Sequence, residues 1–220
     1  KFRFYIVQDY VYLQDYAKTF AIGVAKAKSH ETSNLFAKYI EVMNGELNVH
    51  EGYLGRFGVT QEEIDNTPAS LDNLSYTSYM LRVAYDEGEA EILAAILSCA
   101  YSYEVIAKNM VKNKPDCVND RFYGEWVVNY ISDRYSRDNK VLIDMLNKLT
   151  VDYSEKQINH LIDIFTVCSK YELNFWEMAW NLSTAKLTGK SSLFIKRRFL
   201  VLPKIHQVFF GLFSISPPFV

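Results

Sequence analysis

Hydrophobic side chains recur at three- and four-residue steps over most of the chain, the spacing that places them on one face of an α-helix. From Phe2 to Lys28 this period runs without a break, which predicts one long first helix. Residues 33–57 show the same period, and Gly55 and Gly58 supply the stop signal that glycine gives at a helix end. The pattern therefore predicts two long helices at the start of the chain.

Start and stop signals divide the rest of the chain into further helices. Thr60 and Ser154 are each followed three residues later by a Glu or Gln, the capping-box spacing of a helix start. We predict a short helix before Pro68, a loop at 113–116, and helices over 75–86, 89–112, 121–149 with a charged interruption around 134–139, and from Ser154 to about Trp180. No part of 1–180 alternates long enough to indicate a sheet. The fold class expected is all-α, with about six antiparallel helices around one core.

Composition changes abruptly near the C-terminus. Only two of the five prolines lie in residues 1–180, as long helices require. Residues 181–220 hold six of the 24 basic residues, none of the 26 acidic ones and six of the 14 phenylalanines. We therefore predict a helical domain over 1–182 and an atypical basic, Phe-rich tail over 183–220.

Charge and cysteine content exclude several classes of function. The net charge is −2 overall and −8 for residues 1–180, which predicts no nucleic-acid partner because such binding needs a basic surface. No apolar run reaches about 18 residues, so we expect no membrane-spanning helix. Three cysteines without a Cys-x-x-Cys pair suit free thiols in the cytoplasm, the expected location.

Polar groups on apolar helix faces mark the candidate chemistry. Asp9 and Tyr12 share the apolar face of the first helix, either as a buried helix–helix hydrogen bond or as part of a site. Cys99 lies in a nearly apolar helix, where cysteine commonly fills space, yet Ser98 and Tyr103 place polar groups around it. Glu172 is either a solvated helix carboxylate or a partly buried one whose raised pKa suits acid–base chemistry.

Six stretches in chain order carry a resemblance to a known family: Phe4–Leu13, Phe20–Lys26, Glu46–His50, Ser75–Met80, Glu91–Tyr103 and Tyr171–Ala179. Together they resemble the TenA family, also called thiaminase II, over about residues 1–180. The first resembles the family's F-x-x-Y-x-x-Q-D-x-x-Y-L pattern, and the last resembles its Y-E-x-x-F-W-x-M-A pattern. The family's first helix would precede Lys1, and the tail has no family counterpart.

The resemblance implies a heme-oxygenase-like helical bundle without heme, assembled as a homotetramer. It also implies hydrolysis of aminopyrimidines, either thiamin or 4-amino-5-aminomethyl-2-methylpyrimidine, to 4-amino-5-hydroxymethyl-2-methylpyrimidine, with no cofactor and no metal. Carried over by position, Cys99 would be the nucleophile that adds to the ring and Glu172 the acid–base residue. Asp9 would hold the exocyclic amino group, and the other pocket residues would be Tyr12, Tyr76, Tyr103 and Tyr123. At the last of these positions strict register gives Phe122, whereas the local Tyr-Gly pair favours Tyr123.

Two other functions remain open from the residues alone. A catalytically silent helical bundle that acts as a regulator or scaffold would keep the fold and lose the chemistry. A cofactor-dependent oxidase would need heme or iron ligands, and Glu46 and His50 are more simply a local hydrogen-bonded pair.

Overall fold

The structure is a computed structural model that describes residues 1–183, apart from the side chains of residues 44–51. Glu46 and His50 therefore lie outside the described side chains, and the predicted tail lies outside the described residues from residue 184 onward. The domain boundary between residues 182 and 183 stays a prediction.

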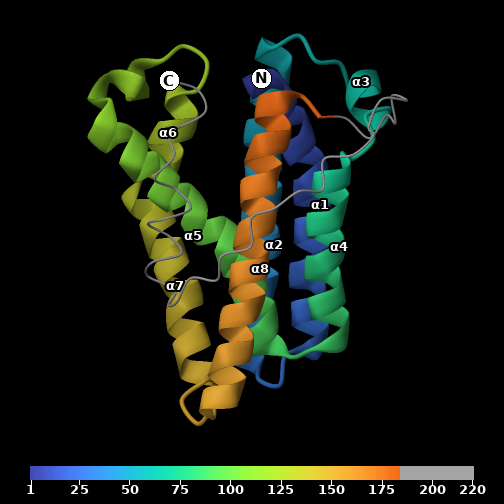
Figure 1. Ribbon diagram of the computed structural model, residues 1–220, viewed down its shortest axis with the longest axis vertical. Coiled ribbons are helices and arrows are strands. Elements are labelled where there is room, and N and C mark those ends of the chain that lie inside the picture. The colour runs from blue at the N-terminus through green and yellow to red at the C-terminus, as the bar shows by residue number, and fades with distance from the viewer. Residues whose placement is uncertain (184–220) are drawn as a thin grey trace, which may run out of the picture.

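The described residues form an all-α bundle, as the sequence predicts. Its elements are α1 (Phe2–Lys26), α2 (His30–Arg56), α3 (Gln61–Asp65), α4 (Leu71–Asp86), α5 (Glu89–Asn113), the 3₁₀ helix η1 (Pro115–Asn119), α6 (Gly124–Tyr130), α7 (Asp133–Leu149) and α8 (Glu155–Asn181). Long helices α1, α2, α4, α5 and α8 run roughly side by side, with α8 in orange between α4 and α5 (Figure 1).

Helix starts are fixed largely by side-chain caps. Ser29, Thr60, Ser70, Ser132 and Ser154 each accept a hydrogen bond from the backbone N–H three residues on. Such a cap satisfies one of the N–H groups that a helix start leaves without a partner. At Ser154 the full capping box with Gln157 is present, which confirms the predicted start of the last helix.

The predicted boundaries are wrong at three places, each for a local reason. Helix α4 begins four residues before the predicted start, because Ser70 caps it. The predicted loop at 113–116 is partly helical, since Pro115 occupies the first turn of η1, where a missing N–H costs nothing. The charged stretch 134–139 does not interrupt a helix but lies within α7, and the break falls at Ile131 and Ser132.

Helix α5 is the central element of the core. It packs between α8, α4 and α7, and its buried positions include nearly every residue from Ala90 to Cys99. By length and composition α5 is long and apolar enough to cross a membrane, but 67% of that window is buried inside the bundle. This is the burial of a core helix, so the apolar run is explained by packing.

Candidate active site

A cavity of about 560 Å³ opens between α1, α2, α5, α6 and α7. Four of the residues singled out from the sequence line it, namely Asp9, Tyr12, Cys99 and Tyr103. Phenol rings and an indole make up much of its wall, contributed by Tyr16, Tyr39, Tyr53, Trp126, Tyr130 and Tyr135. A cavity of this kind suits a flat heteroaromatic ligand, because aromatic walls provide stacking and phenols provide hydrogen bonds.

Cys99 lies one helical turn before Tyr103 on α5 and reaches this cavity. Its side chain is 8% exposed, so the thiol is shielded from bulk water while it lines the cavity wall. Cys117 and Cys168 are also free and buried, but neither lines the cavity. The structure therefore places one thiol where a bound ligand could meet it.

On α1, Asp9 is held by a buried phenol. The Tyr5 hydroxyl donates to Asp9 Oδ2 at 3.1 Å. The same phenol oxygen lies 3.3 Å from the Tyr103 hydroxyl and accepts from Trp126 Nε1 at 3.2 Å. Because Tyr5 donates its single proton to Asp9, its oxygen is left to accept from the other two. Asp9 is thus oriented at one wall of the cavity by residues of α1, α5 and α6.

Glu172 lies on α8 and is 1% exposed; it does not line the cavity itself, but Asp9 and Tyr103, which do, are its electrostatic neighbours. Burial raises the pKa of Glu172 from its usual 4.5 to about 8, and the Asp9 carboxylate raises it further. The nearby hydroxyls of Tyr76 and Tyr103 act in the opposite direction and lower that pKa. The structure therefore favours the buried alternative over a solvated carboxylate, with the proton held near neutral pH.

Oε2 of Glu172 has no hydrogen-bond partner among the described residues. A buried carboxyl oxygen without a partner is costly, because its hydration is lost and nothing replaces it. The bundle therefore holds a carboxyl oxygen with unused hydrogen-bonding capacity close to Asp9 and Tyr103, two residues of the cavity wall.

Tyr76 and Tyr12 connect Glu172 with the cavity wall. The two rings lie 5.2 Å apart, and Tyr76 stacks on Tyr171 at 5.9 Å. Burial raises the pKa of both phenols well above 10, so both keep their protons at neutral pH. Tyr12 lines the cavity directly, whereas Tyr76 lies behind it, between α1, α5 and α8.

Tyr123, like Tyr76 and Glu172, is a candidate residue outside the cavity lining. Its ring meets Phe2 edge-on at 6.2 Å. Its neighbour Phe122 is 45% exposed and stacks on Phe57 at 6.1 Å. Of the two residues left open by the sequence, Tyr123 faces the bundle and Phe122 faces outward.

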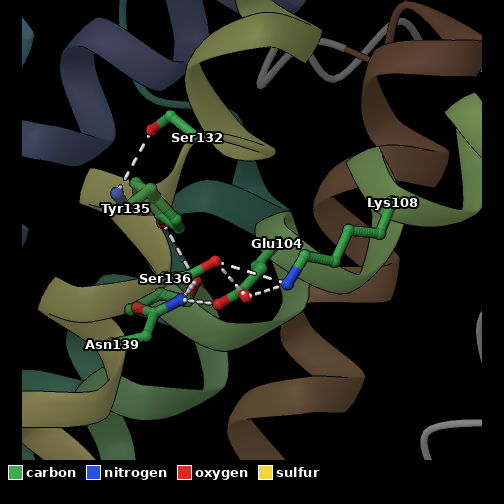
Figure 2. Close-up of polar contacts among 7 residues, drawn as sticks. Glu104, Lys108, Ser132, Tyr135, Ser136 and Asn139 are labelled. Carbon is green, nitrogen blue, oxygen red and sulfur yellow. Dashed lines mark hydrogen bonds and ion pairs between the residues drawn. The ribbon is translucent and has the colours of Figure 1, made fainter.

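The far wall of the cavity is fixed by a polar cluster between α5 and α7, shown in Figure 2. Glu104 is 7% exposed and accepts hydrogen bonds from Lys108, Ser136 and Asn139. Burial acts to raise the pKa of Glu104, but these donors outweigh it and lower that pKa. Asn139 also donates to the Ala100 carbonyl at 3.1 Å, so the cluster is anchored next to Cys99.

Sequence reasoning missed several residues of this site. Tyr5 and Tyr16 share the helical face of Asp9, and Trp126 and Tyr130 share a face of α6, so spacing alone could have indicated them. Their convergence is a tertiary feature, because Tyr5 and Trp126 are 121 residues apart in the chain. Ser98, which approaches Tyr76 at 2.9 Å, was noted only as a polar neighbour of Cys99.

The arrangement combines a thiol, the Asp9 carboxyl group and neutral phenols around one aromatic cavity, with the protonated carboxyl of Glu172 buried behind its wall. Such a set suits nucleophilic addition to an electron-poor ring together with proton transfer to a leaving group. A second hollow of about 550 Å³ is lined by Lys28, Glu87, Glu89 and Glu91, but its wall provides no thiol. Among the described residues, no three His, Cys, Asp or Glu side chains are grouped to hold a metal ion.

Comparison with known proteins identifies the family and agrees with the fold. A family model described as "TENA/THI-4/PQQC family" matches residues 1–182. An aminopyrimidine aminohydrolase of Helicobacter pylori is 40% identical over 181 residues, which cover 82% of this chain and 83% of that protein. An aminopyrimidine aminohydrolase of Halalkalibacterium halodurans is 37% identical over 182 residues, covering 82% and 81% respectively.

Solved structures similar to this chain share the same fold. A TenA family transcription regulator from Silicibacter superposes with a TM-score of 0.75 at 25% identity, covering 80% of each chain. A TenA homologue from P. horikoshii OT3 superposes with a TM-score of 0.70 at 29% identity, covering 82% of each chain.

Proposed function

The chain belongs to the TENA/THI-4/PQQC family, and on that premise we propose that it is a hydrolase of thiamin salvage that acts on aminopyrimidines. The single observation that carries the proposal is that Cys99, Asp9 and Tyr103 line one aromatic cavity, with the buried Glu172 next to Asp9 and Tyr103 behind its wall. The names of the relatives at 37–40% identity support the same reaction class. The substrates proposed are 4-amino-5-aminomethyl-2-methylpyrimidine and thiamin.

The proposed reaction replaces the group on the exocyclic methylene by water. The aminomethyl compound and one water give the hydroxymethyl compound and ammonia, and thiamin and water give the same alcohol and the free thiazole. In the first step the Cys99 thiolate adds to a ring carbon, which places electron density in the ring. That density expels the leaving group from the methylene, water adds there, and the thiolate then departs to restore the ring.

Each named residue has a physical reason for its role. Asp9, oriented by Tyr5, would accept a hydrogen bond from the exocyclic amino group of the pyrimidine. Glu172 holds a proton near neutral pH, so it can protonate a departing amine and then accept a proton from water. Tyr12 and Tyr103 would pack against the ring, and Tyr76 would orient the Glu172 carboxyl from behind the cavity.

The three cysteines are free thiols, so the protein would act in the cytoplasm, where thiols stay reduced. This location and the absence of nucleic-acid or membrane partners stay predictions from the sequence.

The direct test is incubation of the full chain with each of the two pyrimidines, followed by chromatographic detection of the hydroxymethyl product. Cys99→Ser should lower turnover by about 10⁴–10⁶-fold, the scale of a lost covalent nucleophile, while the protein still folds. Cys117→Ser is the matched control, because this thiol is also free and buried but lies outside the cavity. It should leave turnover unchanged.

A Cys99→Ser protein that is active and merely less stable would remove the nucleophile assignment. Absence of product from either pyrimidine, with the fold intact, would instead favour a catalytically silent bundle with a regulatory or scaffold role.

A further inference from the structure

Asn139 lies on α7 in the wall of the candidate active site, and the proposed reaction gives it no role. The residue is 3% exposed. Its amide nitrogen donates to the Ala100 carbonyl at 3.1 Å and to Glu104 Oε2 at 2.6 Å, and Figure 2 shows it directed toward Glu104. An amide nitrogen carries two protons, so both donors of Asn139 are used within the protein.

The Asn139 amide is held in this orientation by Glu104. Burial acts to raise the pKa of Glu104, but its three hydrogen-bond donors outweigh burial and lower that pKa, so the carboxyl is ionised at neutral pH and can only accept. If the amide were turned over, Oδ1 would face the Glu104 carboxylate and the Ala100 carbonyl, which are both acceptors. Two hydrogen bonds would be replaced by two repulsive contacts, so the nitrogen stays on the side of α5.

The amide oxygen of Asn139 is therefore the atom that remains for a ligand. Oδ1 accepts no hydrogen bond from any residue that the structure describes, and it is not one of the fully enclosed polar atoms without a partner. Because Asn139 lines the cavity, this oxygen faces the space that a ligand would fill. The amide thus offers the cavity a fixed acceptor and no donor.

Two walls of the cavity then carry acceptors, with Asp9 on α1 and Asn139 on α7, helices that stand apart in Figure 1. In the proposed substrates the pyrimidine ring has one donor, the exocyclic amino group, which Asp9 would hold. The ring nitrogens only accept, and the 2-methyl group does neither. In the aminomethyl compound the remaining donor is the amine on the methylene, and in the product of hydrolysis it is the hydroxyl there.

We propose that Asn139 is a specificity-determining residue, whose Oδ1 accepts a hydrogen bond from the donor group on the exocyclic methylene, the amine of the substrate or the hydroxyl of the product. The ligand class it selects is aminopyrimidines with a donor at that position, because an apolar group there leaves Oδ1 without a partner. Glu104 does not line the cavity, and it acts as a positioning residue through the Asn139 amide. The identity of the ligand rests on the proposed function.

The test compares two ligands that differ in one group and undergo no net reaction with water in the proposed chemistry. They are 4-amino-5-hydroxymethyl-2-methylpyrimidine and its 5-ethyl analogue, in which a methyl group replaces the hydroxyl. Calorimetry with the full chain measures the dissociation constant of each. We expect wild type to bind the hydroxymethyl compound about 10–100-fold more tightly, the scale of a hydrogen bond whose loss leaves a buried acceptor unpaired.

Asn139→Ala should reduce this preference by about 10-fold or more, and circular dichroism checks that the variant is folded. Ser136→Ala is the matched control, because Ser136 donates to the same Glu104 carboxylate at 2.6 Å but does not line the cavity. This control disturbs the polar cluster and leaves the hydrogen bond between Glu104 and Asn139 in place. Its preference for the hydroxymethyl compound should therefore equal that of wild type.

A crystal structure of wild type with the hydroxymethyl compound needs no variant. It should place the ligand hydroxyl about 3 Å from Asn139 Oδ1. Equal affinities of the two compounds in wild type, failure of both to bind, or an unchanged preference in Asn139→Ala would each overturn the proposal. An equal loss in Ser136→Ala, or a ligand hydroxyl directed away from Asn139, would do the same.

Neither measurement needs turnover, so the outcomes separate this proposal from the proposed function. A chain that shows the expected preference but hydrolyses neither pyrimidine would refute the reaction and keep the Asn139 assignment. A chain that hydrolyses the aminomethyl compound but binds the two ligands equally would keep the reaction and refute the assignment.

Discussion

Replacing Glu172 by glutamine is expected to stabilise the protein at neutral and alkaline pH while it lowers turnover by about 10²–10⁴-fold. Glutamine keeps the shape of the side chain but cannot ionise. The wild-type carboxyl is buried, and its pKa lies near 8 instead of 4.5. The folded protein therefore holds a proton that the unfolded chain has already released at pH 7.

The magnitude follows from the width of this pH window. Each unit of pKa difference corresponds to about 1.4 kcal/mol. The stability associated with the protonated carboxyl is fully present below pH 4.5, decreases as pH rises, and reaches its full loss above pH 8. The free energy of unfolding should thus fall by about 3 kcal/mol between pH 4.5 and pH 7, and by about 5 kcal/mol in total. The glutamine variant lacks this decrease.

Urea unfolding followed by circular dichroism, at fixed protein concentration and at pH 5, 7 and 8.5, measures the difference. Glu172→Gln should be close to wild type at pH 5 and more stable by about 3 kcal/mol at pH 7. Glu177→Gln is the matched control, because Glu177 lies on the same helix but is exposed. It should differ from wild type by less than about 0.5 kcal/mol at every pH.

A Glu172→Gln protein whose advantage does not grow with pH would refute the reasoning, because the buried carboxyl would then be ionised in the folded state. A variant less stable than wild type at pH 8.5 would have the same consequence.

Three further predictions follow from packing and surface. Asn139→Ala removes a hydrogen-bond donor from the buried Glu104 and should lower the free energy of unfolding in urea by about 1–3 kcal/mol. Asn147 is exposed on the same helix, so Asn147→Ala should leave stability unchanged, and equal effects of the two variants would contradict the prediction. Gly23→Ala places a Cβ 2.7 Å from an aromatic ring of α2 and should lower the free energy of unfolding by about 1–3 kcal/mol. The Cβ of Gly52→Ala meets no atom within 4 Å, so this variant should be more stable than wild type by about 0.5–1 kcal/mol. Thermal unfolding that ranks the two variants the other way would refute the clash at Gly23. We expect a homotetramer, because large apolar side chains stay exposed on α4 and α8. Light scattering should give a mass of about four times 25.5 kDa, and a monomer at micromolar concentration would contradict this prediction.

Helix positions followed from the sequence wherever local chemistry decides them. The start of α8 at Ser154 was predictable because a capping box satisfies its own backbone groups without help from the rest of the fold. The break between α6 and α7 was misplaced, because the charges of 134–139 simply cover an exposed helix face while Ser132 provides the cap that starts α7. The cap at Ser132 is a local helix-start signal, whereas a run of charges does not by itself end a helix.

Site residues were predictable to the extent that polar groups occupied apolar faces and matched the motifs of a known family. Asp9, Tyr12, Cys99 and Tyr103 were selected in this way, and the structure brings them to one cavity. Spacing places Tyr5 one turn before Asp9 on the same face of α1, but it could not show that Trp126 meets Tyr5, since that contact joins helices far apart in the chain.

The sequence by itself determined the all-α class, because the 3.6-residue period and the scarcity of proline leave no other way to bury these side chains. It also determined which helix faces meet the core. Only the tertiary structure decided that Glu172 is fully buried and keeps its proton near neutral pH, since that depends on α1, α4 and α5 closing around α8. The same closure decided that Ser98 meets Tyr76, because a hydrogen bond between two helices depends on how they pack, which neither helix encodes alone.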